Sequence, residues 1–423
     1  MQKLVIDGGK PLVGEITVQT AKNAALPIIA ACILTDEPVI IKNCPRLNDI
    51  DAMLDIMRHL GCKAEFNGSD LTVCCNDVAL NVINSDLTGK LRSSIFILGS
   101  ILSRCRRAYI SHPGGCEIGL RPIDLHISGL KSLSVHIVDD SGVICCDGSE
   151  MKSGIINLDF ASVGATENLM MAGALLDGET VIVNAAREPE IVDLARFINA
   201  MGGSVAGAGE SVIHIKGVKK LHGCTYTPMP DRICAGTYLA ATAVTGGEIA
   251  VNGVVREHIF GITERLKAVG AKISVQDGVA HIASGGKSLR PIHKLETNVY
   301  PAFPTDMQPQ FCAVLSRASG TSVIIENLFE NRFGYTSELV KMGANITVKD
   351  RIAVVNGVDR LHGAIVKACD LRGGAALVIA ALCADGRSIV CGTEHIDRGY
   401  EGIENVFTAL GASIKRVNGG EES

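Results

Sequence analysis

The chain has 423 residues, 47% of them hydrophobic, and it carries a formal charge of −5. This charge argues against broad nucleic-acid binding, which depends on neutralising phosphates with lysine and arginine. The length predicts about two or three domains. Because only 4% of the residues are aromatic and none is tryptophan, their cores must be built from Ala, Val, Ile and Leu.

The start of the sequence and its cysteines predict a cytoplasmic protein. Residues 1–7 lack the basic stretch, apolar core and small-residue cleavage site of a signal peptide. The longest apolar run that could be considered as a membrane span, residues 24–34, is shorter than the roughly 20 residues of a membrane-spanning helix. The 15 cysteines are scattered without zinc-site spacing, so we expect free thiols in a reducing compartment, no bound metal and no membrane association.

The first elements alternate between strand and helix. Residues 15–18 predict a strand, residues 24–34 a helix of small apolar residues, and residues 39–41 a β-branched strand. An amphipathic helix over 48–60 follows, and Gly61 suits the left-handed position that closes a helix. Alternation at this density indicates α/β units.

The junction between a helix end and the next strand recurs along the whole chain. Its marker positions are separated by 68 or 73 residues, and the first half repeats in the second at an offset of 209 residues. Five markers are glycine and one is serine: Gly61, Ser134, Gly202, Gly270, Gly343 and Gly411. We therefore expect six units, arranged as two lobes of three units that each close on themselves.

The boundary between the lobes is expected after the third unit. Residues 22–229 would form the first lobe, and residues 230–423 the second. Residues 11–14 correspond to 220–223 at the start of the second half, so residues 1–21 are expected to join the second lobe. The polypeptide would then pass between the lobes twice. We expect a cleft between the lobes, which is a favoured place for ligands.

Lys22 opens the first small-residue helix, and the offset of 209 places Asp231 at the matching position. A lysine at a helix N-terminus adds charge to backbone N–H groups that already attract anions. An ordinary surface lysine is the alternative. The almost wholly apolar helix that follows favours a first turn that lines a site.

Cys116 lies in residues 112–121, a loop with three glycines and a proline. These residues allow backbone shapes that others forbid, which is typical of a mobile lid. A cation such as Arg121 beside a thiol favours its reactive thiolate. The alternative is an inert cysteine, which describes most of the fifteen.

Several arginines recur in glycine-rich or acidic turns, where a guanidinium can bind carboxylate or phosphate through two hydrogen bonds. They are Arg92, Arg121, Arg332, Arg372 and Arg398. A surface salt bridge is the alternative for each of them. Asp306, between two prolines, could be a helix cap or a general base. The residues alone predict an anion-binding cleft beside one thiol.

Nine segments in order resemble the enolpyruvyl transferases that act on UDP-N-acetylglucosamine, over essentially the full length. The segments are 22–27, 113–116, 121–126, 162–166, 187–193, 303–308, 330–333, 370–372 and 395–401. The resemblance implies an α/β fold of two lobes, each an inside-out α/β barrel of three βαβαββ units. This agrees with the repeats counted independently.

The resemblance also implies a reaction without a cofactor. The sugar 3′-hydroxyl attacks C2 of phosphoenolpyruvate while C3 gains a proton, and phosphate then leaves, in the first committed step of peptidoglycan precursor synthesis. By resemblance Cys116 protonates C3 and is the target of fosfomycin, while Asp306 takes the hydroxyl proton. Lys22, Arg121 and Arg398 would hold the phosphate and carboxylate.

By the same resemblance, other residues line the sugar-nucleotide side, and Asp370 and Arg372 complete the closed cleft. The lining residues are Asn23, Arg92, Asp124, Leu125, Ser162, Val163, Leu328 and Arg332. Further substrate-binding residues by this resemblance are Arg121, Pro122, Ile123, Gly164 and Asp306. Phe160 stands where some family members carry a lysine, and a phenylalanine cannot donate a hydrogen bond to the diphosphate or uridine.

Two other functions fit parts of the pattern. A 3-phosphoshikimate 1-carboxyvinyltransferase shares the fold but uses another acceptor; the Cys116 loop and residues 187–190 favour the sugar nucleotide. A repeat scaffold that binds sugar nucleotides without turnover is the alternative from another class. The joint presence of Lys22, Cys116, Asp306 and Arg398 argues against it, because a pure binder needs neither acid nor base.

Overall fold

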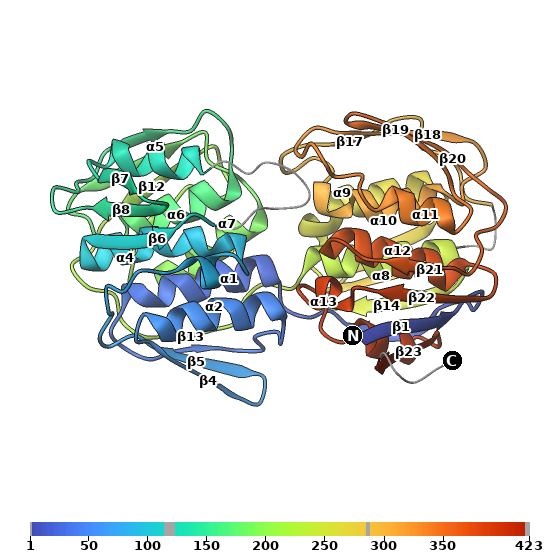
Figure 1. Ribbon diagram of the computed structural model, residues 1–423, viewed down its shortest axis with the longest axis horizontal. Helices are drawn as coiled ribbons and strands as arrows, with labels where there is room; N and C mark the ends of the chain where they lie inside the picture. Colours follow the sequence, from blue (N-terminus) through green and yellow to red (C-terminus); the bar gives the residue numbers. More distant parts are fainter. Residues whose placement is uncertain (1, 114–122, 285–287, 419–423) are drawn as a thin grey trace. The chain divides into compact units, whose positions relative to one another are not determined.

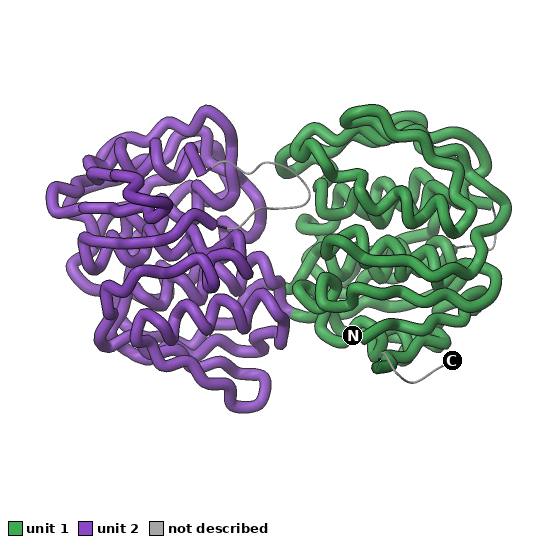
Figure 2. The backbone as a smooth tube through the Cα atoms, viewed as in Figure 1, with its two compact units in different colours: residues 1–19, 117–120, 230–423 green, residues 20–116, 121–229 purple. Residues whose placement is uncertain are grey.

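The computed structural model describes residues 2–113, 123–284 and 288–418. These residues form two compact units (Figure 2). Unit 1 contains residues 2–19 and 230–418, and unit 2 contains residues 20–113 and 123–229, apart from the gaps just given. Across the described ranges, none of the helices combines the length and hydrophobicity that crossing a membrane requires.

Three inner helices pack together in unit 2, namely α1 (Lys22–Ala31), α4 (Ile97–Cys105) and α6 (Val163–Gly173) (Figure 1). Nearly all their residues are buried, which explains why their sequences are apolar or small on every side. The amphipathic helices α2 (Asn48–His59), α5 (Asp124–Ser132) and α7 (Pro189–Ala200) bury one face each. The short helices η1 (Cys32–Leu34), α3 (Ser85–Thr88) and η2 (Arg92–Phe96) join these elements.

Three sheets complete unit 2. Their strand orders are β13-β3-β5-β4, β6-β8-β7 and β11-β12-β10-β9. The bounds are β3 (Val39–Ile41), β4 (Lys63–Asn67), β5 (Asp70–Cys74), β6 (Arg107–Ser111), β7 (His136–Asp140), β8 (Val143–Asp147), β9 (Ile155–Asn157), β10 (Glu179–Val183), β11 (Val205–Ala206), β12 (Val212–Lys216) and β13 (Thr225–Tyr226). The central strands β5, β8, β10 and β12 alternate buried with less buried residues, so one face of each sheet packs inward.

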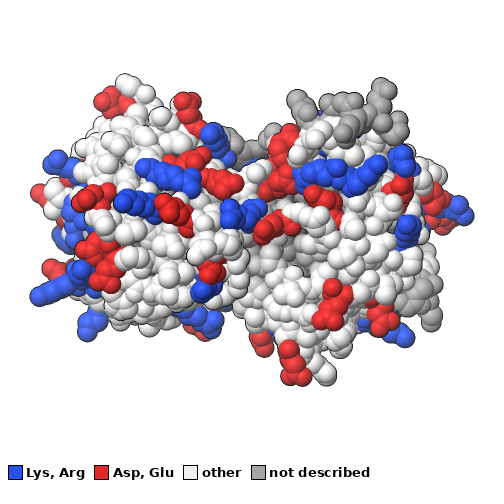
Figure 3. All heavy atoms as spheres, turned by 90° about the horizontal axis from the view of Figure 1, so that it is seen from below, with Lys and Arg blue, Asp and Glu red and all other residues white. Residues whose placement is uncertain are grey.

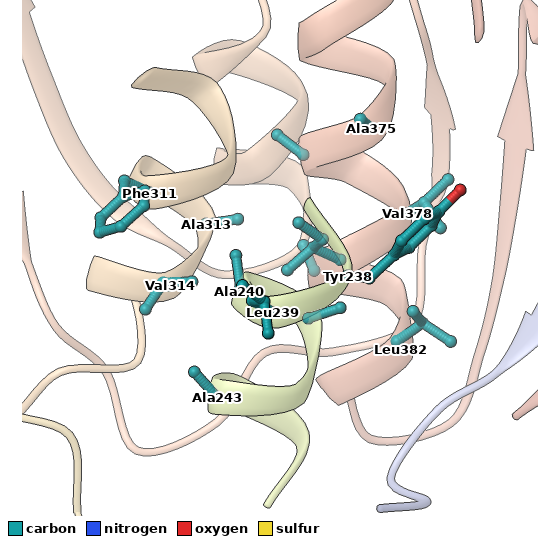
Figure 4. Packing of buried hydrophobic residues seen from close by; sticks show 14 of the residues in the cluster. Tyr238, Leu239, Ala240, Ala243, Phe311, Ala313, Val314, Ala375, Val378 and Leu382 are labelled. Carbon is teal, nitrogen blue, oxygen red and sulfur yellow. The ribbon is translucent and has the colours of Figure 1, made fainter. Parts of the chain in front are cut away.

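Unit 1 repeats this plan. Its inner helices are α8 (Arg232–Thr245), α10 (Gln308–Leu315) and α12 (Leu371–Cys383), which pack through Tyr238, Leu239, Phe311 and Val378 among others (Figure 4). The other helices are α9 (Arg256–Ala268), η3 (Thr305–Met307), α11 (Thr336–Lys341), α13 (Thr393–Ile396) and α14 (Ile403–Ala409).

The sheets of unit 1 include strands from both ends of the chain. Their orders are β15-β16-β14-β2, β17-β18-β20-β19 and β21-β22-β1-β23. The bounds are β1 (Gln2–Asp7), β2 (Val13–Thr17), β14 (Glu248–Asn252), β15 (Lys272–Gln276), β16 (Val279–Ala283), β17 (Leu295–Thr297), β18 (Thr321–Glu326), β19 (Asn345–Lys349), β20 (Ile352–Asn356), β21 (Ile365–Lys367), β22 (Arg387–Cys391) and β23 (Ser413–Asn418). β2 pairs parallel with β14, and β1 lies antiparallel between β22 and β23 (Figure 1).

One strand pattern recurs in the sheets and confirms the predicted inside-out α/β fold of βαβαββ units. In each four-stranded sheet one inner strand has a parallel neighbour at the sheet edge and an antiparallel neighbour on its other side, as β10 has in β9 and β12. Where the chain connects such a parallel pair directly, as from β9 to β10, from β17 to β18 and from β21 to β22, a buried inner helix supplies the crossover. The β6-β8-β7 sheet has three strands and a single parallel bridge, Ile83 to Ile110, at the place of the fourth.

The marker positions have the left-handed backbone that the repeat predicted. Their φ angles lie between 65° and 109°. They are Gly61, Ser134, Gly202, Gly270, Gly343 and Gly411. Ser134, with φ of 65°, therefore takes the same conformation as the glycines although it carries a Cβ atom. The repeat that carries Ser134 therefore keeps the same turn, at the steric cost of a Cβ atom in a left-handed conformation.

The expectation that all the cysteines are free thiols is wrong for Cys62 and Cys75, which form a disulfide. The hairpin of β4 and β5 pairs Lys63 with Cys74, so Cys62 and Cys75 are the next residues outward on the two strands. Their Cα atoms are 4.3 Å apart, next to the short end of the usual disulfide range of roughly 4.4–6.8 Å. Cysteine spacing alone could not reveal this pair, because the hairpin register creates it.

On the face seen in Figure 3, lysine and arginine side chains alternate with aspartate and glutamate over each unit. No broad surface of one sign is present on this face.

We predict opposite effects on stability from exchanging serine and glycine at two marker positions. Ser134→Gly should raise the free energy of unfolding by up to about 1 kcal/mol, and Gly411→Ser should lower it by about 1 kcal/mol. A Cβ atom at Gly411 would meet no heavy atom within 4 Å, so backbone conformation alone is tested there. Chemical denaturation measures both changes, and changes of the same sign would contradict the assignment of the serine to the glycine position.

Candidate active site

The predicted site residues gather at the N-terminal ends of the inner helices. Lys22 is the first residue of α1, and Ser162 is the N-cap of α6. In unit 1, Asp306 lies in η3 directly before α10, and Asp370 is the N-cap of α12. Backbone N–H groups without helical partners and the positive end of the helix dipole both lie at such ends, so each repeat presents a place that favours anions.

Unit 1 holds a compact charged cluster around Asp306. The Arg372 Nη2 and Nε atoms lie 2.9 and 3.2 Å from Asp306 Oδ2, and Arg332 Nη2 lies 3.3 Å from Asp306 Oδ1. Arg332 Nη1 is also 3.8 Å from Asp370 Oδ1. The Arg332 and Arg372 side chains are only 2% and 4% exposed. Two carboxylates thus balance two buried guanidinium groups.

The structure rules out one of the two roles left open for Asp306, that of a helix cap. The N-caps of η3 and α10 are Pro304 and Met307, and neither helix has a side-chain cap. By contrast, Asp231 and Asp370 accept hydrogen bonds from the first backbone N–H groups of α8 and α12. Asp306 is therefore no helix cap, and its carboxylate faces guanidinium groups.

Unit 2 holds a buried ion pair that the sequence analysis missed. Lys22 Nζ lies 2.9 Å from Asp49 Oδ2, with the side chains 10% and 4% exposed. Asp49 is in the first turn of α2, on the same face as the buried Met53 and Met57. An acid within an apolar stripe was the available signal, because buried charges are nearly always paired. The N-cap of α1, Ala21, has no side-chain oxygen to cap the helix.

The N-terminus of α6 packs closely against η2. A Cβ atom at Gly164 would lie 2.8 Å from the Phe96 ring, so this position needs glycine. Ser162 accepts a hydrogen bond from the Ala165 backbone N–H at 3.4 Å. Arg92, the first residue of η2, donates to the Pro113 carbonyl at 3.4 Å. Residues predicted from three separate segments of unit 2 therefore meet around the start of α6.

His126 is a buried neutral imidazole behind this region. The Gly99 N–H donates to Asn168 Oδ1 at 2.7 Å, which orients the amide so that Asn168 Nδ2 donates to His126 Nδ1 at 3.1 Å. The remaining nitrogen, Nε2, must then carry the imidazole proton. Burial, and secondarily the charge of Arg92, lowers the pKa of His126 to about 4.

Glu167 is a second buried titratable group that the sequence analysis did not identify. It is 1% exposed on α6, and neither carboxyl oxygen has a hydrogen-bond partner among the described residues. Burial, together with the charges of Glu190 and Glu188, raises the pKa of Glu167 well above its usual value. A glutamate just before the apolar run 169–172 was the signal for it.

The other predicted residues are exposed, half-buried or outside the described part of the chain. Asp124 is exposed at the start of α5, and Arg398 is half-buried between α13 and α14. Half-buried positions also hold Asn23, Ile123, Leu125, Val163 and Leu328. Cys116, Arg121 and Pro122 lie outside the described residues. Phe160, two residues before Ser162, is 50% exposed.

No metal site accompanies these clusters in the described ranges: no three His, Cys, Asp or Glu side chains there are arranged to hold an ion. What the clusters offer is buried positive groups for anions, and in Asp306 a carboxylate that can accept a proton.

Comparison with known proteins decides the family. The family model described as EPSP synthase (3-phosphoshikimate 1-carboxyvinyltransferase) matches residues 6–407. The chain belongs to the EPSP synthase family of enolpyruvyl transferases. Its resemblance to these enzymes, inferred from nine short segments, is thereby confirmed.

Three relatives that match over almost their full length share the name of one activity. A protein of Caldanaerobacter subterraneus named UDP-N-acetylglucosamine 1-carboxyvinyltransferase 2 is 50% identical over 99% of this chain and 100% of its own. One of Carboxydothermus hydrogenoformans, named UDP-N-acetylglucosamine 1-carboxyvinyltransferase 1, is 47% identical over the full length of both. A Thermotoga maritima protein named UDP-N-acetylglucosamine 1-carboxyvinyltransferase is 46% identical over 99% of each chain.

Two solved structures share the fold at lower identity. The enolpyruvyl transferase NikO from Streptomyces tendae has a TM-score of 0.88 and 24% identity over 98% of both chains. An EPSP synthase from Acinetobacter baumannii has a TM-score of 0.75 and 20% identity over 99% of this chain and 100% of its own. At this identity the likeness concerns the fold alone.

We predict that His126 makes unit 2 less stable as the pH falls. With the pKa of His126 lowered to about 4 in the folded chain, the unfolded chain binds a proton there first as the pH drops below about 6.5. Stability should therefore fall between pH 6.5 and 4, by about 2 kcal/mol from this group between pH 7 and 5.

Denaturation at both pH values should show that His126→Gln loses less stability on acidification than the unmodified chain. The matched control is His281→Gln, at an exposed histidine. Equal pH dependence in the His126→Gln variant and the unmodified chain would contradict the prediction.

Proposed function

We propose that this chain transfers the enolpyruvyl group of phosphoenolpyruvate to the 3′-hydroxyl of UDP-N-acetylglucosamine and releases phosphate. One observation carries the proposal: relatives 44–50% identical over at least 98% of the chain carry the name of this activity. EPSP synthases of known structure, which use 3-phosphoshikimate, are 19–20% identical. In sequence identity, the chain is more similar to the proteins named for UDP-N-acetylglucosamine than to these EPSP synthases.

In the proposed reaction the sugar oxygen forms a bond to C2 while C3 gains a proton from Cys116, which gives a tetrahedral intermediate. The bond from C2 to the phosphate oxygen then breaks, C3 loses a proton, and the enol ether is left on the sugar. Asp306 is the proposed base for the hydroxyl proton. Lys22, Arg121 and Arg398 are the proposed partners of phosphate and carboxylate.

The surroundings of Asp306 support its role. A carboxylate that accepts hydrogen bonds from two guanidinium groups is in its ionised form, which is the form that can take a proton. Anionic groups of the substrates can compete for Arg332 and Arg372 and so release the carboxylate for the hydroxyl. A positioned base typically contributes ~10²–10⁴ in rate.

The sugar-nucleotide side of the proposal uses residues at the start of α5 and α6, including Asp124, Leu125 and Ser162. Of these proposed residues, Lys22 belongs to unit 2 and Asp306 to unit 1. We also propose that the enzyme works in the cytoplasm, the compartment suggested by the scattered spacing of its 15 cysteines.

We predict that the full chain releases phosphate from phosphoenolpyruvate when UDP-N-acetylglucosamine is added, and not when shikimate 3-phosphate is added. A colorimetric phosphate assay with each acceptor, and with neither, measures this directly. Release with shikimate 3-phosphate alone would assign the other activity. If calorimetry shows that UDP-N-acetylglucosamine binds but no phosphate is released, the non-catalytic scaffold would be the remaining function.

We predict that Asp306→Asn lowers kcat by about 10²-fold or more, because the amide cannot take the hydroxyl proton, and changes the Kd of UDP-N-acetylglucosamine much less. Steady-state kinetics and calorimetry separate the two effects. Asp385→Asn is the matched control, since Asp385 also pairs with an arginine, Arg360, but on the surface. Equal losses of kcat and affinity would make Asp306 a binding residue instead.

A further inference from the structure

A buried polar network extends from Arg372 on the side away from Asp306. Arg372 Nη1 lies 3.3 Å from the Tyr400 hydroxyl, which lies 2.8 Å from Thr237 Oγ1. Gln310 Nε2 donates to Thr237 Oγ1 at 3.1 Å and approaches the Tyr400 hydroxyl at 3.4 Å. Tyr400, Thr237 and Gln310 are all fully buried. They come from the turn before α14, from α8 and from α10, so the network joins separate repeats of unit 1.

The number of protons fixes the direction of each hydrogen bond. The Thr237 hydroxyl lies 2.8 Å from the Ile233 carbonyl, which can only accept, so Thr237 gives its single proton there. At the contact with Thr237 the Tyr400 hydroxyl must then be the donor. Arginine has only donors, so the Tyr400 oxygen accepts from Arg372. The order runs from Arg372 to Tyr400, to Thr237 and to the carbonyl of Ile233.

Tyr400 can fill both roles because its phenol keeps its proton. Burial raises the pKa of Tyr400 to about 12, although the Arg372 charge acts in the other direction. At neutral pH the hydroxyl is therefore both donor and acceptor.

The guanidinium of Arg372 is thus held from two sides. Its Nη2 and Nε atoms bind Asp306, and its Nη1 atom binds Tyr400. A buried guanidinium must find acceptors for its N–H groups, and a planar group bound at three nitrogens has one orientation. Without the Tyr400 hydroxyl, Nη1 would lose this acceptor and the group could turn away from Asp306.

We propose that Tyr400 is a positioning residue for the reaction, and that Thr237 holds Tyr400 in turn. Through these hydrogen bonds, Tyr400 and Thr237 keep the Nε and Nη2 atoms of Arg372 directed at Asp306. The inference rests on the proposed function, in which Asp306 is the base.

The test compares Tyr400→Phe with Tyr238→Phe, which makes the same chemical change at a nearby buried tyrosine. Tyr238 lies among the buried residues of unit 1 (Figure 4). It is 2% exposed and meets the Phe407 ring edge-on at 5.7 Å. Tyr400→Phe should lower kcat by about tenfold or more, the loss expected for one hydrogen bond to a charged group, with less than a twofold change in KM for UDP-N-acetylglucosamine. Tyr238→Phe should retain kcat. Equal kcat values for the two variants would overturn the proposal.

Thr237 supplies a second, independent comparison. Thr237→Val should lower kcat as Tyr400→Phe does, and Thr237→Ser, which keeps the hydroxyl, should restore it. The double variant Tyr400→Phe with Thr237→Val should be no slower than either single variant. Independent losses that multiply in the double variant would show that the two hydroxyls do not act as one chain.

A readout without turnover separates this proposal from the proposed function. The shift in unfolding midpoint for Tyr400→Phe combined with Arg372→Lys should be smaller than the sum of the single shifts, because both remove the same contact. Tyr238→Phe combined with Arg372→Lys should be additive. Additivity in both pairs would overturn the positioning role even in an active enzyme, whereas coupling in a chain that releases no phosphate would overturn only the proposed reaction.

Discussion

A helix that is buried on every side can carry charged groups only at its ends, and this constraint decides where the chemistry lies in each unit. The helices α1, α8 and α12 are buried along almost their whole length. Their sides are accordingly apolar or small, and their first turns hold Lys22, Asp231, Asp370 and Arg372. The same ends carry the unpaired backbone N–H groups, so the fold favours anions where it also tolerates charge.

Burial at these ends requires that each cation have a partner. Lys22 pairs with Asp49, and Arg372 pairs with Asp306, in both cases with little exposure. Removing one member of such a pair leaves an uncompensated buried charge, which is far more costly than the pair itself. The carboxylates of Asp49 and Asp306 therefore hold these cations in place. The hydroxyl of Tyr400 extends the same principle to the other side of Arg372.

Local signals were enough to predict the repeating fold, because each unit carries its own helix ending. The left-handed position needs glycine or a strained substitute, so the markers were readable one by one, including Ser134 in the degenerate unit. Asp49 could also have been found, because it interrupts an apolar stripe of α2. The link between Thr237 and Tyr400 could not, since 163 residues separate them and neither stands out in its own helix or turn. The pairing of Cys62 with Cys75 needed the register of a hairpin.

By itself the sequence determined the two triplicated α/β lobes, the enolpyruvyl transferase family and the segments that hold the charged residues. These follow from periodicity, turn chemistry and short motifs, which are properties of neighbouring residues. Only the tertiary structure decided which charges meet, that Asp306 faces Arg332 and Arg372 instead of capping a helix, and which way the hydroxyl of Tyr400 points. Such pairings depend on distances between segments far apart in the chain, and a linear pattern contains no distances of that kind.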